Sequence, residues 1–240
     1  MRIDKFLANT GYGSRKEVKK LLKDGIVSVN DTLCKDPKKH IDPKKDHVTV
    51  QGESVVYREF IYLMMNKPQG VISATEDIYT NTVIDLLDEK DAIWHPFPVG
   101  RLDKNTEGLL LLTNDGQLAH HLLSPKKEVP KTYFAVIEGE VTDADKKAFQ
   151  QGVTLDDGYH TKPSELHIEK SGERSYIELT ITEGKFHQVK RMFKAVGKKV
   201  TYLQRIKMGT LMLDRRLALG DYRELTGKEL QALKKYLPKK

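Results

Sequence analysis

A short apolar run between two polar segments limits the folds that this chain can adopt. Leu109 to Leu112 is the longest uninterrupted aliphatic stretch, and it lies between the charged segment 99–108 and the turn residues Asn114-Asp115-Gly116. Spanning a bilayer takes roughly 20 apolar residues, so no membrane span is expected. A short apolar run bounded by turn residues is typical of a buried strand. We therefore expect a soluble protein in which a core strand carries a charged loop at its start.

The composition narrows the class of protein further. With 240 residues, of which 38% are hydrophobic, the chain can build a sizeable core, and we expect two domains. The amino end lacks the apolar core of a signal peptide, so we expect a cytoplasmic protein. The single cysteine, Cys34, excludes an intrachain disulfide and a cysteine-based zinc cluster. His120 and His121 are adjacent on an expected helix, which is poor geometry for chelation, and no metal site is expected.

The charge of the chain favours a polyanionic partner. The formal net charge is +7. Residues 1–60 hold 13 basic and 9 acidic residues, a surplus of four, whereas the other 180 residues share a surplus of three. The amino-terminal quarter is therefore the more basic part of the chain per residue.

Two short helices are expected at the amino end. One covers residues 3–9, and a second begins at Ser14, which forms a capping box with Glu17, and ends near Asp24-Gly25. Four lysines recur along one face of the second helix at i, i+3, i+4 and i+7: Lys16, Lys19, Lys20 and Lys23. This lysine stripe suits a phosphate backbone, although a solvated helix face is the plainer interpretation.

A small hairpin is expected next, with strands at 26–29 and 32–33 around an Asn30-Asp31 turn and a further strand at 47–51. Together with Met1 to Leu7 and the segments 13–18 and 25–30, it resembles the S4 RNA-binding domain over about residues 1–50. The resemblance implies that this domain binds RNA through basic side chains. The candidates are Arg2, Lys5, Arg15, Lys16, Lys19, Lys20 and Lys23.

A polar stretch at 51–59 follows, which we interpret as a linker, and the pattern of apolar residues changes after it. Strand-like and helical segments then alternate, which indicates an α+β domain with a substantial, mainly antiparallel sheet. The expected strands are 61–65, 108–113, 132–137, 175–182 and 202–208. The expected helices are 82–88, 116–123, 142–151, 187–196 and 226–237. We expect domain limits of 1–58 and 59–240.

The charged loop before the apolar run carries the most specific motif. Asp103 alone suits a turn or cap as well as an active site. However, Gly100-Arg101-Leu102-Asp103, followed by the segment 106–116, resembles the signature of the RsuA-type pseudouridine synthases, which modify rRNA and also carry an amino-terminal S4 domain. In that family the aspartate that matches Asp103 is catalytic.

Two further segments, 131–133 and 183–193, support the same resemblance. It implies that Lys190 is the basic partner of Asp103, at a position where many relatives have arginine, so the charge is kept without the bidentate fork. Tyr133 matches a tyrosine that packs against the target base, and it is a catalytic candidate that would assist proton removal from C5 of that base. Leu203 matches an apolar wall. Both residues could equally be core residues. The helix after Phe186 puts cations on one face, so His187 and Arg191 are further substrate-binding candidates.

The resemblance implies an enzyme that converts a specific uridine of 16S rRNA to pseudouridine without a cofactor. Asp103 would act as a nucleophile or a base on a nucleotide flipped out of its stack. Arg101 would hold the RNA phosphate or fill the vacated stack. The Phe186-His187-Gln188-Val189 segment favours the small subunit, and we expect rRNA within small-subunit particles as partner and a monomeric protein. Two alternatives stay open: the same chemistry on 23S rRNA, and a non-catalytic S4-type RNA-binding protein.

Overall fold

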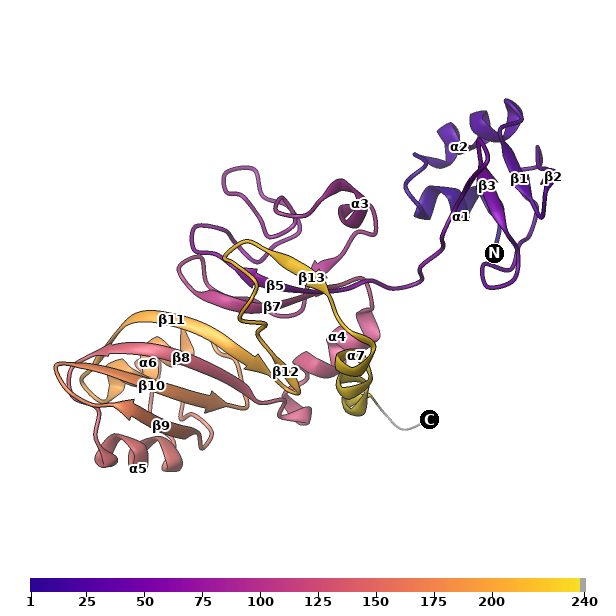
Figure 1. The fold of residues 1–240 in the computed structure, drawn as a ribbon. Coiled ribbons are helices and arrows are strands. Elements are labelled where there is room, and N and C mark those ends of the chain that lie inside the picture. Colours follow the sequence, from indigo (N-terminus) through magenta and orange to yellow (C-terminus); the bar gives the residue numbers. More distant parts are fainter. Residues whose placement is uncertain (238–240) are drawn as a thin grey trace. The chain divides into compact units, whose positions relative to one another are not determined.

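The computed structural model describes residues 1–237, and they form two compact units (Figure 1). The first unit comprises Met1–Ile61 together with Asp88–Pro96, and the second comprises Tyr62–Leu87 and the chain from Phe97 onward. The limits expected from the sequence, 1–58 and 59–240, stay a prediction about where independent domains begin and end.

The first unit begins with the two expected helices, α1 (Ile3–Asn9) and α2 (Arg15–Lys23). The capping box at the start of α2 is present, because the Ser14 side chain accepts the backbone N–H of Glu17 and the Glu17 carboxylate accepts that of Ser14. Val18 and Leu22 are buried on one face of α2, as the periodicity predicts. The lysine-bearing face is exposed.

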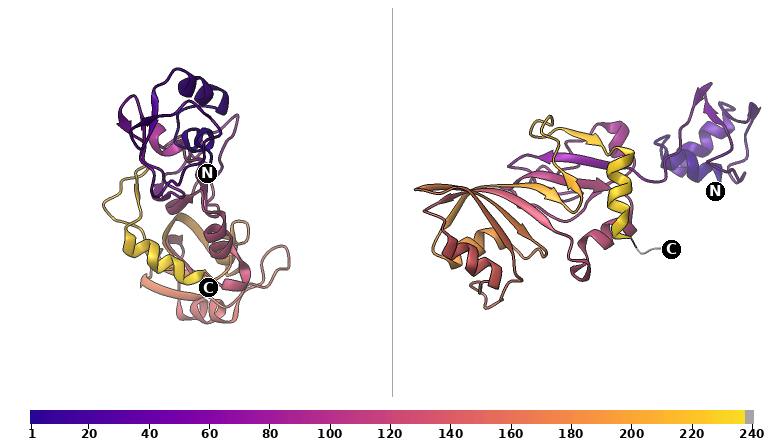
Figure 2. Two further views of the ribbon diagram at one scale, coloured as in Figure 1. Left: turned by 90° about the vertical axis from the view of Figure 1, so that its right-hand side faces the viewer. Right: turned by 60° about the horizontal axis from the view of Figure 1, so that its bottom comes forward.

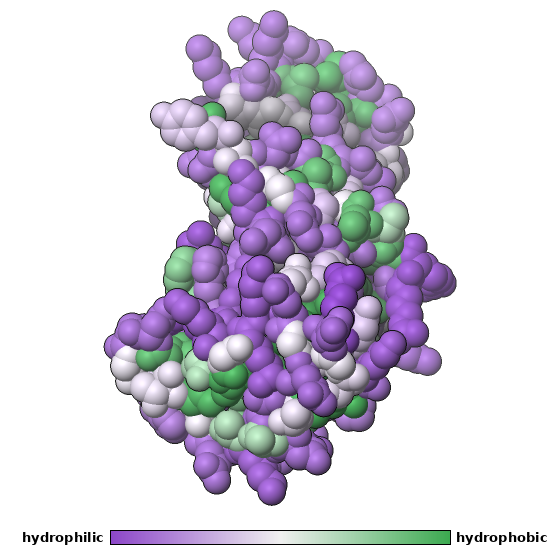
Figure 3. Space-filling view, turned by 90° about the vertical axis from the view of Figure 1, so that its left-hand side faces the viewer, coloured by the Kyte–Doolittle hydropathy of each residue, from purple (hydrophilic) through white to green (hydrophobic). Residues whose placement is uncertain are grey.

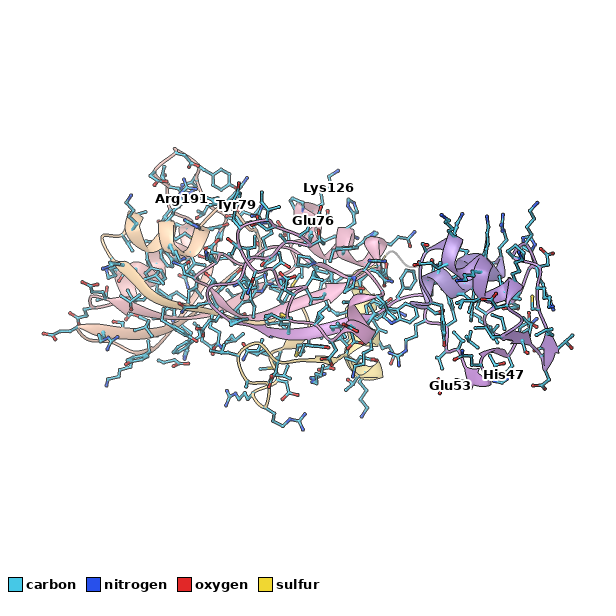
Figure 4. All side chains as sticks on the ribbon, turned by 90° about the horizontal axis from the view of Figure 1, so that it is seen from above. His47, Glu53, Glu76, Tyr79, Lys126 and Arg191 are labelled. Carbon is cyan, nitrogen blue, oxygen red and sulfur yellow. The ribbon has the colours of Figure 1, made fainter. Side chains whose placement is uncertain are left out.

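A small antiparallel sheet completes this unit, in the order β2-β1-β3-β4. Its strands are β1 (Val27–Val29), β2 (Thr32–Leu33), β3 (Val48–Val50) and β4 (Glu53–Ser54). His47 and Glu53, labelled in Figure 4, lie at the β3–β4 hairpin. The interpretation of 51–59 as a linker is wrong for its first part: Val55 and Tyr57 pack on the core, and the Tyr57 ring stacks on Phe6 with centroids 5.3 Å apart.

The second unit is built on a large mixed sheet, so the predicted α+β class is confirmed. Within the described residues the sheet has nine strands, with a main path β13-β5-β7-β11-β8-β10-β9. All neighbours on this path are antiparallel except β7 and β11, which are parallel. The strands are β5 (Tyr62–Lys67), β6 (Phe97–Pro98), β7 (Glu107–Thr113), β8 (Lys131–Glu138), β9 (Glu165–Lys170), β10 (Arg174–Ile181), β11 (Lys199–Met208), β12 (Leu211–Met212) and β13 (Tyr222–Glu224).

Helices cover this sheet in two groups (Figure 2). α4 (Gly116–Leu123) and α7 (Gly227–Leu233) share a core with β5 and β7, which includes Leu109, Leu122 and Leu233. α5 (Asp143–Gln151) and α6 (Gln188–Ala195) pack on the β9 and β11 part of the sheet, and they touch each other through Phe149 and Phe193. The remaining helical segments are short: α3 (Glu89–Ala92), η1 (Pro125–Lys127) and η2 (Lys234–Tyr236).

The helix expected at 82–88 is wrong. Thr82 is fully buried and forms a backbone bridge with Ile72, so its backbone is extended, and the next helix begins only at Glu89. The strands β4, β6, β9, β12 and β13 were missed. Four of them have only two or three residues, and β9 alternates only weakly between buried and exposed residues.

Hydrophilic side chains cover most of the face drawn in Figure 3. Within residues 1–237, no helix combines the length and the apolar character that crossing a membrane requires.

Candidate active site

The charged loop that contains Asp103 leads into β7 four residues later, beside the parallel seam between β7 and β11. Glu107 pairs with Gln204 and Gly108 with Arg205 across this seam. Gly108 has a φ of 103°, and a Cβ there would lie 2.3 Å from the backbone oxygen of Arg205. Only glycine permits this approach of the two strands. The loop is therefore mounted on the centre of the sheet.

The Asp103 carboxylate faces two side chains at the start of α6. Lys190 Nζ lies 3.3 Å from Asp103 Oδ2, and His187 Nε2 lies 3.6 Å from the same oxygen. Lys190 also donates to Asn105 Oδ1 at 2.6 Å. The Asp103 side chain is 27% exposed, so a substrate can reach it. The structure thus brings together two residues that are 87 positions apart in the sequence.

A cavity of about 80 Å³ opens beside this carboxylate. Its walls come from the loop, from β8 and β11 and from the turn before α6. Four further candidate residues line it together with Asp103: Arg101, Tyr133, His187 and Leu203. Tyr133 and Leu203 are almost completely buried, at 8% and 5% exposure, and present an aromatic and an aliphatic wall. A charged edge and an apolar wall suit a flat, partly polar ring.

A buried lysine that the sequence analysis missed holds the loop in place. Lys67, at the end of β5, is fully buried, and its ammonium donates to the backbone oxygens of Pro68, Asp103 and Thr106 at 2.9, 3.1 and 3.0 Å. Burial lowers the pKa of Lys67 to about 8, and the negative charge of Asp103 opposes that effect. In the sequence, Lys67 stands two residues after the expected strand 61–65, and this position alone does not show what its ammonium contacts.

Further buried polar contacts join the strands under the site. The Ser73 hydroxyl donates to the oxygen of Leu102 and accepts its N–H, both at 3.0 Å. The Tyr202 hydroxyl on β11 donates to the Glu107 carboxylate on β7 at 2.6 Å, and burial and this carboxylate raise the pKa of Tyr202. Arg205 is buried and donates to the backbone oxygen of Leu109 at 2.8 Å. These bonds fix the β7–β11 seam.

Two family models match this chain. One, described as RNA pseudouridylate synthase, covers residues 61–195, and one described as S4 domain covers residues 1–48. The chain belongs to the RNA pseudouridine synthases. The protein is therefore an intramolecular isomerase with an amino-terminal S4 domain, and it binds RNA through both domains. The alternative of a non-catalytic binding protein is set aside.

Characterised and uncharacterised synthases are among its relatives. It is 57% identical over 234 residues to the uncharacterized RNA pseudouridine synthase YtzG of Bacillus subtilis (strain 168), covering 97% of this chain and 98% of the relative. It is 39% identical to ribosomal small subunit pseudouridine synthase A of Vibrio cholerae serotype O1, covering 97% and 99%. It is 38% identical to ribosomal large subunit pseudouridine synthase B of B. subtilis (strain 168), covering 97% and 95%.

A solved structure agrees with this family. The crystal structure of a pseudouridylate synthase is 35% identical, covers 97% of this chain and 99% of its own, and superposes with a TM-score of 0.68.

Two candidates of the synthase unit, Lys190 and Arg191, do not line the cavity. Lys190 contacts its edge through Asp103, whereas the Arg191 guanidinium binds Asp156 and Asp157, with 2.7 Å between Nη2 and Asp157 Oδ2. These contacts lower the pKa of both aspartates. Arg191 and Tyr79 lie at the same edge of the unit in Figure 4. Arg191 thus anchors the loop 156–157 to α6, and a substrate-binding role for it stays a prediction.

The RNA-binding candidates of the S4 domain differ in whether their side chains are exposed or already paired within the domain. The lysines of the stripe, together with Lys5 and Arg15, are exposed. Arg2 instead forms a two-pronged pair with the buried Asp4, at 3.0 Å from Nε and 2.6 Å from Nη2. Its guanidinium is thus engaged within the domain.

The adjacent histidines show no chelating arrangement. The rings of His120 and His121 meet edge to face, and His121 Nδ1 bonds the backbone oxygen of Gln117 at 2.8 Å. Among residues 1–237 no cluster of three or more His, Cys, Asp or Glu side chains has the geometry of a metal site.

Proposed function

We propose that this synthase isomerises one uridine of 16S rRNA, with Asp103 as the catalytic residue. A single observation supports the assignment of Asp103: its accessible carboxylate borders the cavity and pairs with the Lys190 ammonium at 3.3 Å. The Lys190 ammonium attracts the carboxylate and holds it at the edge of the cavity. A carboxylate fixed beside the bound nucleotide is what the reaction requires.

The reaction needs no net oxidation or reduction. The bond between N1 of uracil and C1′ of ribose breaks, the uracil turns, and C5 bonds to C1′. The hydrogen on C5 leaves for solvent as a proton, and the ring nitrogen freed from the ribose takes up a proton, so the product is an isomer of uridine. Asp103 acts in one of two ways: as a nucleophile on C1′, or as a base that removes a ribose proton to give a glycal. Lys190 holds the carboxylate in position in either route.

The cavity walls bind the base, and cations outside them bind the RNA backbone. Tyr133 and Leu203 hold the uracil between an aromatic and an aliphatic surface. A paired uridine must leave its stack to reach them, at a cost of a few kcal/mol. Arg101, exposed at the rim, holds the phosphate of the flipped nucleotide. The lysine stripe of the S4 domain adds affinity that falls with salt.

The choice of rRNA rests on a short segment. Phe186-His187-Gln188-Val189 favours the small subunit, and the small-subunit synthase of V. cholerae supports this at 39% identity. The 38% identity to a large-subunit synthase favours 23S rRNA as the alternative. We propose small-subunit particles as substrate and a monomeric enzyme.

Tritium release tests the residue and the substrate together. Unmodified rRNA labelled with tritium at uridine C5 is assembled into small-subunit or large-subunit particles and incubated with wild type, Asp103→Asn or Asp143→Asn. Asp143 is an exposed aspartate in the first turn of α5, so its variant makes the same charge change away from the cavity. We expect release from small-subunit particles by wild type and Asp143→Asn only. Release from large-subunit particles alone would move the substrate to 23S rRNA, and full release by Asp103→Asn would reject the catalytic assignment.

A further inference from the structure

Phe186 is a large apolar side chain left in solvent beside the active-site cavity. It is 74% exposed, whereas its neighbours Lys185 and His187 line the cavity. Scattered exposed apolar residues are normal in proteins, so exposure alone implies nothing. The residues around Phe186, and not its exposure, indicate a role for it.

The Phe186 ring continues an aromatic surface that starts at the catalytic carboxylate. Its centroid lies 3.8 Å from that of His187, and the two planes are 19° apart. The other end of the imidazole, Nε2, lies 3.6 Å from Asp103 Oδ2. A flat stack therefore leads outward from Asp103, with the outer face of Phe186 open to solvent.

The backbone holds this stack in an unusual conformation. His187 has φ 49° and ψ 31°, in the left-handed region that residues other than glycine rarely adopt. The turn before α6 is fixed by the buried Gln188, which accepts the N–H of Lys185 at 2.8 Å and donates to Glu183 at 2.6 Å. The exposed ring is thus carried by a braced turn.

Cations flank the ring on the side of the charged loop. A depression there is lined by Phe186, Arg101, Lys104 and Lys185. Within the described part of the chain, neither Arg101 nor Lys104 has a recorded ion pair. Unpaired cations beside an open aromatic ring match the alternation of phosphates and bases in single-stranded RNA. Charge therefore favours RNA over a protein surface as the partner.

We propose that Phe186, supported by His187, is a stacking platform for the nucleobase next to the target uridine. Arg101 and Lys104 take the phosphate that joins the two nucleotides. This deepens the proposed function and rests on Asp103 being the catalytic residue, but it holds for either rRNA. Stacking accepts every base, so the platform positions the strand and does not read its sequence.

Kinetics of tritium release provide the first test. Phe186→Ala should lower kcat/KM by about 5- to 100-fold, mainly through KM, because one base loses its stacking partner. Phe186→Tyr keeps the ring and should stay within about 3-fold of wild type. Leu219→Ala removes another exposed apolar side chain, 52% exposed, and should have no effect. Wild-type kinetics in Phe186→Ala, with an unchanged melting temperature, would overturn the platform.

Fluorescence tests the stacking without requiring turnover. The chain has one tryptophan, Trp94, so Phe186→Trp in a Trp94→Phe background gives a single reporter on the platform. A ten-nucleotide oligouridylate should quench it, and heparin, an anion without bases, should not. Equal responses to both probes would overturn the proposal. Quenching by oligouridylate from an enzyme that releases no tritium would reject the proposed function and keep the platform.

One outcome would assign the ring to another class of partner. If Phe186→Ala binds protein-free RNA as tightly as wild type and loses affinity only for RNA–protein particles, then the ring contacts protein and the stacking proposal fails.

Discussion

The buried Lys67 makes the stability of the synthase unit depend on pH in a defined direction. The pKa of a free lysine, about 10.5, falls to about 8 in the folded protein. The difference corresponds to about 3 kcal/mol, at 1.36 kcal/mol for each pKa unit. Below pH 8 both states carry the charge, and the folded state bears the full cost of burying it. Between pH 8 and 10.5 the folded state releases its proton first, so the stability increases with pH.

Lys67→Met isolates this contribution. Methionine keeps the length of the side chain and removes the charge, so the cost of burying the charge disappears. Three backbone oxygens lose their donor at the same time, at about 1–3 kcal/mol for each one left unsatisfied. The two effects oppose each other at pH 7, and the variant should fold.

The measurement is urea unfolding of wild type and Lys67→Met at pH 7, 8, 9 and 10. The free energy of unfolding of wild type minus that of the variant should rise by up to about 3 kcal/mol over this range. Lys131, whose pKa burial also lowers to about 8, contributes equally to both proteins and cancels. A difference that stays constant from pH 7 to 10 would refute the assignment of a buried, charged Lys67.

Three further perturbations test the seam, the ion pair and the lysine stripe. Gly108→Ala should cost at least about 2 kcal/mol, because φ is 103° and the added Cβ meets a backbone oxygen of β11, and thermal unfolding measures the loss. Lys190→Met should lower the rate of tritium release by about 100-fold or more. Lys190→Arg and the exposed control Lys199→Met should stay within about 10-fold of wild type. Equal rates in all three variants would remove Lys190 from the mechanism. Lys16→Glu combined with Lys20→Glu should reduce the slope of log affinity against log salt by about 1.4 to 1.8 and leave the synthase unit folded; an unchanged slope would contradict RNA binding by the stripe.

Local signals predicted the regular elements well. The capping box at Ser14 predicted the start of α2, because a cap depends only on residues within one turn, and the structure has matching boxes at Thr142 and Thr226 where α5 and α7 begin. The helix expected at 82–88 fails for the opposite reason. Its apolar residues follow a helical spacing, but Thr82 forms a backbone bridge with Ile72, and the residues after it form bends and turns instead of a helix. A contact with a residue ten positions earlier lies outside the single turn that a cap covers.

The site was predictable only in part for the same reason. The resemblance suggested a pair between Asp103 and Lys190, and the structure places their charged atoms 3.3 Å apart. Lys67 was missed because nothing in the sequence near it shows that its ammonium reaches a loop 36 residues away. The contacts of Arg191 with Asp156 and Asp157 likewise depend on a turn that comes close to α6 only in the folded sheet.

Two lysines contact different parts of Asp103, one its backbone and the other its carboxylate. Lys67 bonds the backbone oxygen of Asp103 at 3.1 Å and does not touch the carboxylate, whereas Lys190 bonds the carboxylate at 3.3 Å. Loss of Lys67 should therefore displace the loop and lower the rate at every pH at which the enzyme is folded. Loss of Lys190 should leave the loop in place and lower kcat with little change in KM, whereas a displaced loop should also raise KM because Arg101 moves with it. Tritium-release kinetics of Lys67→Met and Lys190→Met distinguish these effects, and the same changes in kcat and KM in both variants would show that the two lysines act through a single property of the loop.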